Sequence, residues 1–329
     1  MQNDTVDSIQ QRAESMTRES EQPHWIGGVE PPKELLAMNG TQMLEHECRE
    51  QPARLRTLIA AYKNQEEIRE ELDAIRDAVS RSRAPVIFIG MGGSLSASVS
   101  ASTHLQSNGR VAFSVDAGEW LHYARPVWKD AAISVVVTAS GESAELVEFM
   151  KQDLAGPSAL ICNSPASPCW KLAQHPLPIL AGPEYGNATK TYTNSTASGL
   201  ILASEILGHE WKGDADCAAD VMANNIDRIF AMRRRLEEFC RGAANLEVVG
   251  RGAGYGAAYM GALTIREMSG FRAAAHTGGG FRHGPNLDTN GTHVAMIFAV
   301  GRAAALGVKL AAECNRKGGR VVLVSNDEI

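Results

Sequence analysis

The sequence has 329 residues, of which 44% are hydrophobic and 21% charged, and its formal net charge is −6. This amount of apolar material can form one large or two medium hydrophobic cores. The mildly acidic balance argues against nucleic acid as a partner, because neutralising its phosphates needs clustered Lys and Arg.

Residues 1–37 are polar and contain several prolines, and we expect an N-terminal extension without a signal peptide. A helical pattern begins at Thr41 and meets Pro52, which is expected to kink or restart the helix, and a second helix is expected at about 66–82. No apolar run approaches the roughly 20 residues of a membrane span. The six cysteines are scattered and fit reduced thiols, so we expect a cytoplasmic protein without a membrane partner.

Short apolar runs then alternate with helical patterns. A first buried strand at 86–89 leads into a glycine turn at 90–94 and a helix of small residues, which is the start of a βα unit. Further strands are expected at 133–137, 159–162 and 177–180, with a helix ending at Met150 and another at 193–207. This alternation predicts an α/β fold with a mostly parallel sheet covered by helices on both faces.

The pattern repeats in the second half of the chain. Strands are expected at 246–249, 293–300 and 321–324, and helices at 255–268 and 303–315. The segment 133–164 matches 294–326 in the order and spacing of its elements, which indicates two copies of one unit. We therefore predict a first lobe with its entry helices at 38–210 and a second lobe at 211–329.

The loop at 138–143 brings three hydroxyls, those of Thr138, Ser140 and Ser143, to the start of a helix. Such a terminus carries about +0.5 charge and free N–H donors, which favour a phosphate. Ser94 has the equivalent place after the first strand, and neighbouring parallel strands bring both loops to one crevice. Each serine alone could be only a helix cap; the two loops together favour a phosphate site. In the second copy the matching loop, at 300–304, has lost these hydroxyls.

Two other kinds of site do not fit the spacing. The turn at 90–95 lacks the third glycine of a dinucleotide fingerprint, and the glycines of 250–256 stand at every second place. His276, His283 and His293 are not spaced as metal ligands, and no cysteine joins them. No cofactor and no metal are expected.

Glu267 falls near the end of an apolar helix, and His283 follows the run Gly278-Gly279-Gly280, which is expected to be flexible. In one site, a carboxylate and an imidazole can carry proton transfers on a sugar: one removes the proton beside a carbonyl and the other opens the ring. Taken singly, the two would be a surface helix residue and a loop residue.

The ordered set of motifs resembles the sugar-isomerase (SIS) family, and in particular the tandem SIS domains in the isomerase half of glutamine–fructose-6-phosphate aminotransferase. The matching residues are Glu50-Gln51-Pro52, Gly92-Gly93-Ser94, Ser140-Gly141-Glu142-Ser143, Gly182-Pro183-Glu184-Tyr185-Gly186, Ala188-Thr189-Lys190, Glu267 and His283-Gly284-Pro285. The resemblance covers about residues 40–329 and leaves out the glutaminase half, so ammonia release from glutamine is not expected.

The resemblance implies a role for each group. The sugar phosphate would be held by Ser94, Thr138, Ser140 and Ser143, and the rest of the substrate site would include Gly92, Gly93, Glu184, Thr189 and Lys190. Glu267 would move a proton between C1 and C2. His283 would assist ring opening from the neighbouring subunit of a homodimer with composite sites.

Three departures from the family pattern argue against amination to glucosamine 6-phosphate. Thr264 stands where the family has a lysine, Gly280-Phe281-Arg282 lacks a second carboxylate, and the sequence stops at Ile329, before the family's lysine-bearing tail. Either the second lobe is incomplete or the tail chemistry is gone. We expect an aldose–ketose isomerase or an amino-sugar phosphate deaminase or deglycase acting on a hexose 6-phosphate derivative. The alternative is a phosphosugar sensor that has lost catalysis.

Overall fold

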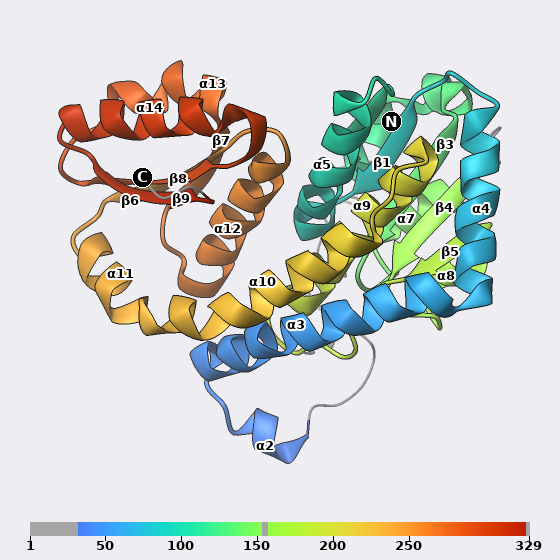
Figure 1. Cartoon of the computed structure of the whole chain (residues 1–329), viewed down its shortest axis with the longest axis horizontal. Coiled ribbons are helices and arrows are strands. Elements are labelled where there is room, and N and C mark those ends of the chain that lie inside the picture. The colour runs from blue at the N-terminus through green and yellow to red at the C-terminus, as the bar shows by residue number, and fades with distance from the viewer. Residues whose placement is uncertain (1–31, 153–156, 327–329) are drawn as a thin grey trace, which may run out of the picture.

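The computed structural model describes residues 32–152 and 157–326. Two parallel β-sheets lie side by side, and each has its own covering helices (Figure 1). The predicted class is confirmed: an α/β chain with two lobes, each built on a parallel sheet flanked by helices. In the part of the chain described, no helix is both long and apolar enough to cross a membrane.

The entry helices are α2 (Lys33–Leu36), α3 (Gly40–Asn64) and α4 (Glu66–Ser80). Asn39 and Gln42 begin α3 with a reciprocal capping box, in which each side chain accepts from the other's backbone N–H at 3.0 Å. Of the two expected effects of Pro52, the restart is wrong, because α3 runs through this residue, and the kink stays a prediction. Pro52 lacks one N–H donor, but it is buried with Leu55 and Leu58, and this packing outweighs the missing hydrogen bond.

The first sheet has the order β2-β1-β3-β4-β5, and all its pairings are parallel. Its strands are β1 (Val86–Gly90), β2 (Ala112–Asp116), β3 (Ile133–Thr138), β4 (Ser158–Cys162) and β5 (His175–Pro178). The flanking helices are α5 (Gly92–Ser107), α6 (Ala117–Tyr123), η1 (Arg125–Asp130), α7 (Ala144–Met150), α8 (Pro168–Leu172) and α9 (Lys190–Leu207). Successive residues of β1 enter opposite cores: Val86 and Phe88 one, Ile87 and Ile89 the other.

The second sheet has the order β7-β6-β8-β9 and is also parallel. Its strands are β6 (Asn245–Gly250), β7 (Ala273–Thr277), β8 (His293–Ala299) and β9 (Arg320–Ser325). The helices of this half are α10 (Lys212–Ala231), α11 (Arg233–Cys240), α12 (Ala253–Ser269), α13 (Gly278–Arg282), η2 (Pro285–Leu287), η3 (Gly301–Ala303) and α14 (Ala304–Arg316).

The glycine run at 278–280 was expected to be flexible, and this expectation is wrong. Gly278, Gly279 and Gly280 form the first residues of α13. The Thr277 side chain caps this helix by accepting from the Gly280 N–H at 3.1 Å, and Phe281 is buried in the core beside it. Capping and burial therefore override the low helix propensity of glycine.

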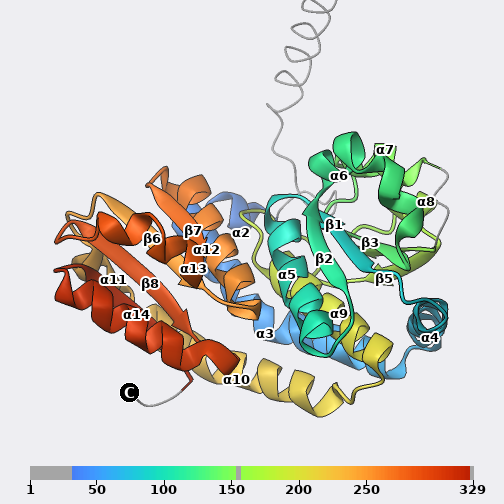
Figure 2. The ribbon, with the colours of Figure 1, turned by 90° about the horizontal axis from the view of Figure 1, so that it is seen from above.

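The two lobes meet through α5 and α12, which face each other between the sheets (Figure 1, Figure 2). The helices run antiparallel, because Gly92 of α5 lies opposite Leu263 while Thr103 lies opposite Gly252. Small residues permit the close approach: a Cβ on Gly256 would lie 2.8 Å from the Ser96 carbonyl oxygen. The Ser96 hydroxyl donates to the Gly256 carbonyl at 2.7 Å and joins the helices.

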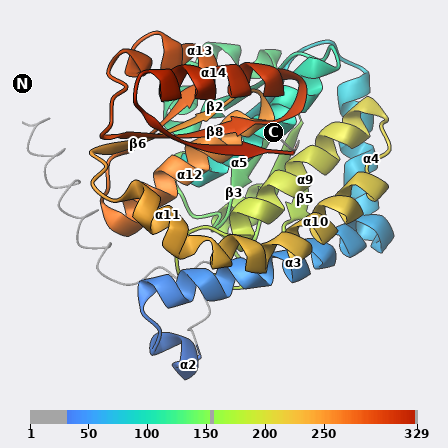
Figure 3. The same ribbon diagram turned by 60° about the vertical axis from the view of Figure 1, so that its left-hand side comes forward.

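Beneath both lobes, α10 runs alongside α3 (Figure 1, Figure 3). Three ion pairs join the two helices: Arg49 with Asp227, Arg56 with Asp220 and Lys63 with Asp216. These pairs are largely exposed, and pairs of this kind contribute at most about 1 kcal/mol each. Trp211, the N-cap of α10, and Ala219 within α10 belong to a core of the first lobe, although both follow the predicted boundary between residues 210 and 211. That boundary stays a prediction.

Candidate functional site

The carboxyl edge of the first sheet brings two of the predicted loops together. Strand β1 pairs in parallel with β3, from Val86 opposite Ile133 to Ile89 opposite Val136. The chain leaves β1 toward β2 on one side, and β3 lies on the other side, so the sheet order reverses at β1. Crevices at such switch points are where open α/β sheets bind ligands. Ser94, in the first turn of α5, and the loop after β3 both belong to this edge.

The loop after β3 has a defined shape. Thr138 is buried, and its Oγ1 accepts from the Gly141 N–H at 3.1 Å, while the Ser140 Oγ accepts from the Glu142 N–H at 3.3 Å. Gly141 has φ of +73°, and a Cβ there would lie 2.2 Å from the Ser167 Oγ, so only glycine fits. Ser143 stands at the N-cap of α7, yet its side chain makes no capping hydrogen bond. The Ser143 hydroxyl therefore does not cap the helix, which is the structural role expected of a serine at this position.

Glu267 lies near the C-terminal end of α12, with its side chain exposed. Leu263 is one turn earlier on the same helix face and lies against Gly92; Met260 lies against Gly93, whose Cβ position is 3.3 Å from the Met260 Sδ. This face of α12 is therefore turned toward the first turn of α5. The packing of α5 on α12 brings Glu267 to the same end of α5 as Ser94.

Asn187 holds the Glu267 carboxylate, and the sequence analysis did not select it. Its Nδ2 donates to the Glu267 Oε2 at 2.6 Å, from a loop of the first lobe to a helix of the second. The sequence feature that could have indicated Asn187 is its position between two motifs that match the family, the segments 182–186 and 188–190.

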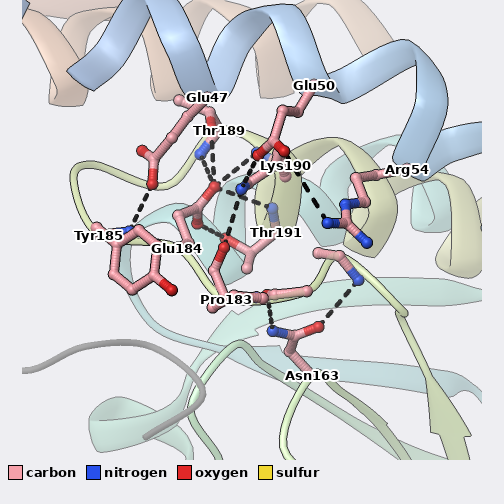
Figure 4. A network of polar contacts seen from close by, with 12 residues as sticks. Glu47, Glu50, Arg54, Asn163, Pro183, Glu184, Tyr185, Thr189, Lys190 and Thr191 are labelled. Atoms are coloured by element: carbon pink, nitrogen blue, oxygen red, sulfur yellow. Dashed lines mark hydrogen bonds and ion pairs between the residues drawn. The ribbon is translucent and has the colours of Figure 1, made fainter. Parts of the chain in front are cut away.

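The loop that carries Asn187 is anchored by Glu184, which is fully buried (Figure 4). Its Oε1 accepts from the backbone N–H groups of Thr189 at 2.9 Å and Lys190 at 2.7 Å, and from the Thr189 hydroxyl at 2.8 Å. The Thr191 N–H donates to the same oxygen at 3.3 Å, and the Thr191 hydroxyl donates to Oε2. A carboxylate here satisfies the free N–H groups at the start of α9.

Lys190 is only 2% exposed and completes the anchor (Figure 4). Its ammonium donates to the Glu50 Oε2 at 2.5 Å and to the Pro183 carbonyl at 2.9 Å. Glu184, Thr189 and Lys190 thus hold the loop in place in this structure, and their predicted contact with substrate stays a prediction.

Two carboxyl groups of α3, those of Glu47 and Glu50, face this loop, and their pKa values are shifted in opposite directions. Burial raises the pKa of the Glu47 carboxyl, although its hydrogen bond from the Tyr185 N–H opposes the shift. Burial also acts to raise the pKa of Glu50, but the Lys190 hydrogen bond and charge, with the charge of Arg54, outweigh it and lower that pKa. The ionised partner of the buried ammonium is therefore Glu50, which was one of the motif residues.

His283 is not brought to Glu267 within one chain. It is exposed at the C-terminal end of α13. Phe281 of α13 shares a core with α14, on the face of the second sheet opposite to the core that contains α12 (Figure 1). Across residues 32–152 and 157–326, no side-chain hydrogen bond links His283 to the first lobe or to α12.

Residues 80–204, which contain the whole first sheet, match the family model of the SIS domain. This part of the chain is similar to an SIS domain. The chain is 27% identical over 275 residues to the glutamine–fructose-6-phosphate aminotransferase (isomerizing) of Bacillus cereus, an alignment that covers 80% of this chain and 45% of that protein. The chain thus spans about half the length of the curated relatives it matches, and the homologous part is their isomerase domain.

Solved structures share the fold of the SIS domain and of the second lobe. The C-terminal domain of glucosamine-fructose-6-phosphate aminotransferase from Francisella tularensis superposes with a TM-score of 0.73 at 19% identity, covering 90% of this chain and 85% of that one. The tagatose-6-phosphate ketose/aldose isomerase from Escherichia coli gives a TM-score of 0.68 at 17% identity, covering 91% and 85%.

Proposed function

We propose that the chain is an enzyme that binds the phosphate of a hexose 6-phosphate derivative and moves a proton between C1 and C2 of the sugar. Ser94 and the loop after β3, with Thr138, Ser140 and Ser143, hold the phosphate. Glu267 is the base. One observation carries the proposal. The Glu267 carboxylate, bound by Asn187, lies at the N-terminal end of α5, and this end of α5 follows β1, where the sheet order reverses. The SIS domain and its aminotransferase and isomerase relatives support it.

The chemistry follows from these groups. The Glu267 carboxylate takes the proton from the carbon beside the carbonyl, and the electron pair forms an enediolate. A proton then passes from the hydroxyl oxygen to the former carbonyl oxygen, and return of the first proton to the neighbouring carbon gives the isomer. On a 2-amino sugar the same transfer gives a ketimine, and water then releases ammonia. Thr264, one turn before Glu267, offers no amine for a Schiff base, which favours isomerisation or deamination over amination.

Solvent exchange tests the proposal directly. In D₂O, we expect deuterium to enter C1 or C2 of at least one of glucose, fructose or glucosamine 6-phosphate, because the abstracted proton exchanges with solvent before it returns. The matching sugars without phosphate should show far less exchange. If a phosphosugar binds but no exchange occurs with any of the three, the chain is a sensor and the proposed enzyme function is wrong.

We further propose that the active form is a homodimer in which His283 of one subunit completes the site of the other. The exposure of His283 and its separation from α12 support this assignment. Heterodimers of Glu267→Gln and His283→Ala chains, co-expressed with two different tags, should regain activity on cyclic substrates. About a quarter of the parent activity is expected from random pairing, since half of the dimers then hold one complete site of two. A fully active monomer in light scattering would contradict the proposal.

A further inference from the structure

The second lobe repeats the backbone of the phosphate crevice. Its sheet order reverses at β6, as the first order reverses at β1. Gly252, after β6, has φ of +54°, close to the +50° of Gly92 after β1. Gly301, after β8, has φ of +63°, close to the +73° of Gly141 after β3. The same strand, glycine turn and helix therefore stand at both switch points.

A cavity of about 520 Å³ opens at this second edge. It is lined by Arg251 and Arg302 from the two loops and by Ser100, Thr103 and Ser107 from α5. Among the described residues that line it, none is acidic. Neither guanidinium has an ion-pair or hydrogen-bond partner anywhere in 32–152 and 157–326. Two cations without counter-charges therefore face one cavity, where the first lobe has hydroxyls.

Ser100 adds a hydroxyl donor to the lining of the cavity. Its side chain belongs to a residue only 7% exposed, and it lines the cavity. In the part of the chain that the structure describes, its hydroxyl has no hydrogen-bond partner. The Ser100 hydroxyl is not among the fully buried unpaired atoms, so it is open to the cavity and can donate to an acceptor bound there.

The crossing of α5 and α12 shows what this second edge lacks. Gly92 lies opposite Leu263, and Gly252 lies opposite Thr103, so one shift of 160 in residue number (92 to 252, 103 to 263) relates both contacts. The same shift relates Ser107 to Glu267. The second crevice therefore has a hydroxyl at the position of the proposed base.

We propose that the carboxyl edge of the second sheet is a second binding site, specific for a phosphate monoester and without a proton-transfer group. Arg251 and Arg302 hold the phosphate, since guanidinium groups match phosphate oxygens with paired N–H donors. The first turn of α12, a helix of 17 residues, adds the positive end of its helix dipole. The cavity volume suits a small metabolite. The site binds a ligand and leaves it unchanged, which is the property of an effector site.

Equilibrium dialysis with labelled inorganic phosphate, at fixed ionic strength, tests this site. We expect two phosphates per chain for the parent protein and one for Arg251→Gln/Arg302→Gln. The matched control is Arg234→Gln/Arg235→Gln on the exposed face of α11, which removes the same charge and should keep two. Ser140→Ala/Ser143→Ala should weaken the other phosphate, so the two sites are assigned separately.

Arg251 needs a second variant, because its guanidinium packs against Gly278, where a Cβ would lie 2.3 Å from the Arg251 Nε. Arg302 is exposed, so Arg302→Glu changes the cavity charge without disturbing that contact. We expect Arg302→Glu to lose the second phosphate with an unchanged Tm and unchanged deuterium exchange at the first site. A parent chain whose bound phosphate is weakened only by Ser140→Ala/Ser143→Ala, or an Arg302→Glu chain that binds as many phosphates as the parent, would overturn the proposal.

Discussion

Glu267→Gln is expected to lower kcat by about 10²–10⁴-fold, the usual contribution of a general base. Glutamine has the shape of glutamate, and its amide oxygen can still accept from the Asn187 Nδ2. The substitution therefore removes the base and leaves its position. Because the phosphate is held by other residues, KM and the rise in Tm caused by phosphosugar should stay close to the parent values.

Two companion variants separate the base from its support. Glu238→Gln makes the same change of charge on the exposed face of α11 and should leave kcat within about twofold. Asn187→Ala keeps the carboxylate but removes its hydrogen bond, so kcat should fall less than in Glu267→Gln. Undiminished deuterium exchange in Glu267→Gln would exclude Glu267 as the base.

Strong local signals made the central strands predictable, and the edge strands β5 and β9 with them, but not the edge strands β2 and β7. Every residue of β1 and β3 is buried, so their apolar runs stand out in the sequence. Both strands that were missed, β2 and β7, lie at sheet edges and are half-exposed. Their sequences, Ala112–Asp116 and Ala273–Thr277, include alanine and aspartate or histidine, which have no strong β preference.

The candidate site was predictable only where it follows the strands directly. Ser94 and the loop after β3 come straight after apolar runs, and parallel pairing brings such loops together. The neighbourhood of Glu267 depends on the crossing of α5 and α12. A glycine such as Gly256 permits this crossing, but its presence in the sequence does not predict it. The prediction for Lys190 came only from the family resemblance: its ammonium pairs with Glu50 beneath the loop, and its contact with substrate stays a prediction.

Glu184→Ala is expected to lower the free energy of unfolding of the first lobe by about 3–5 kcal/mol, the usual cost of removing one partner from a buried charged network. The backbone N–H groups of Thr189, Lys190 and Thr191 would lose their acceptor inside the protein. Glu184→Gln should cost less, because one amide oxygen still accepts from the start of α9.

Urea unfolding followed by tryptophan fluorescence measures this loss. Glu70→Ala, an exposed glutamate of α4, is the matched control and should stay within about 0.5 kcal/mol of the parent chain. Because the same network fixes the loop of Asn187, the Glu184→Ala chain should also lose turnover at temperatures where it remains folded. A Glu184→Ala chain as stable as the Glu70→Ala control would mean that water can replace the carboxylate at the start of α9, and Glu184 would then not be what holds Asn187 against Glu267.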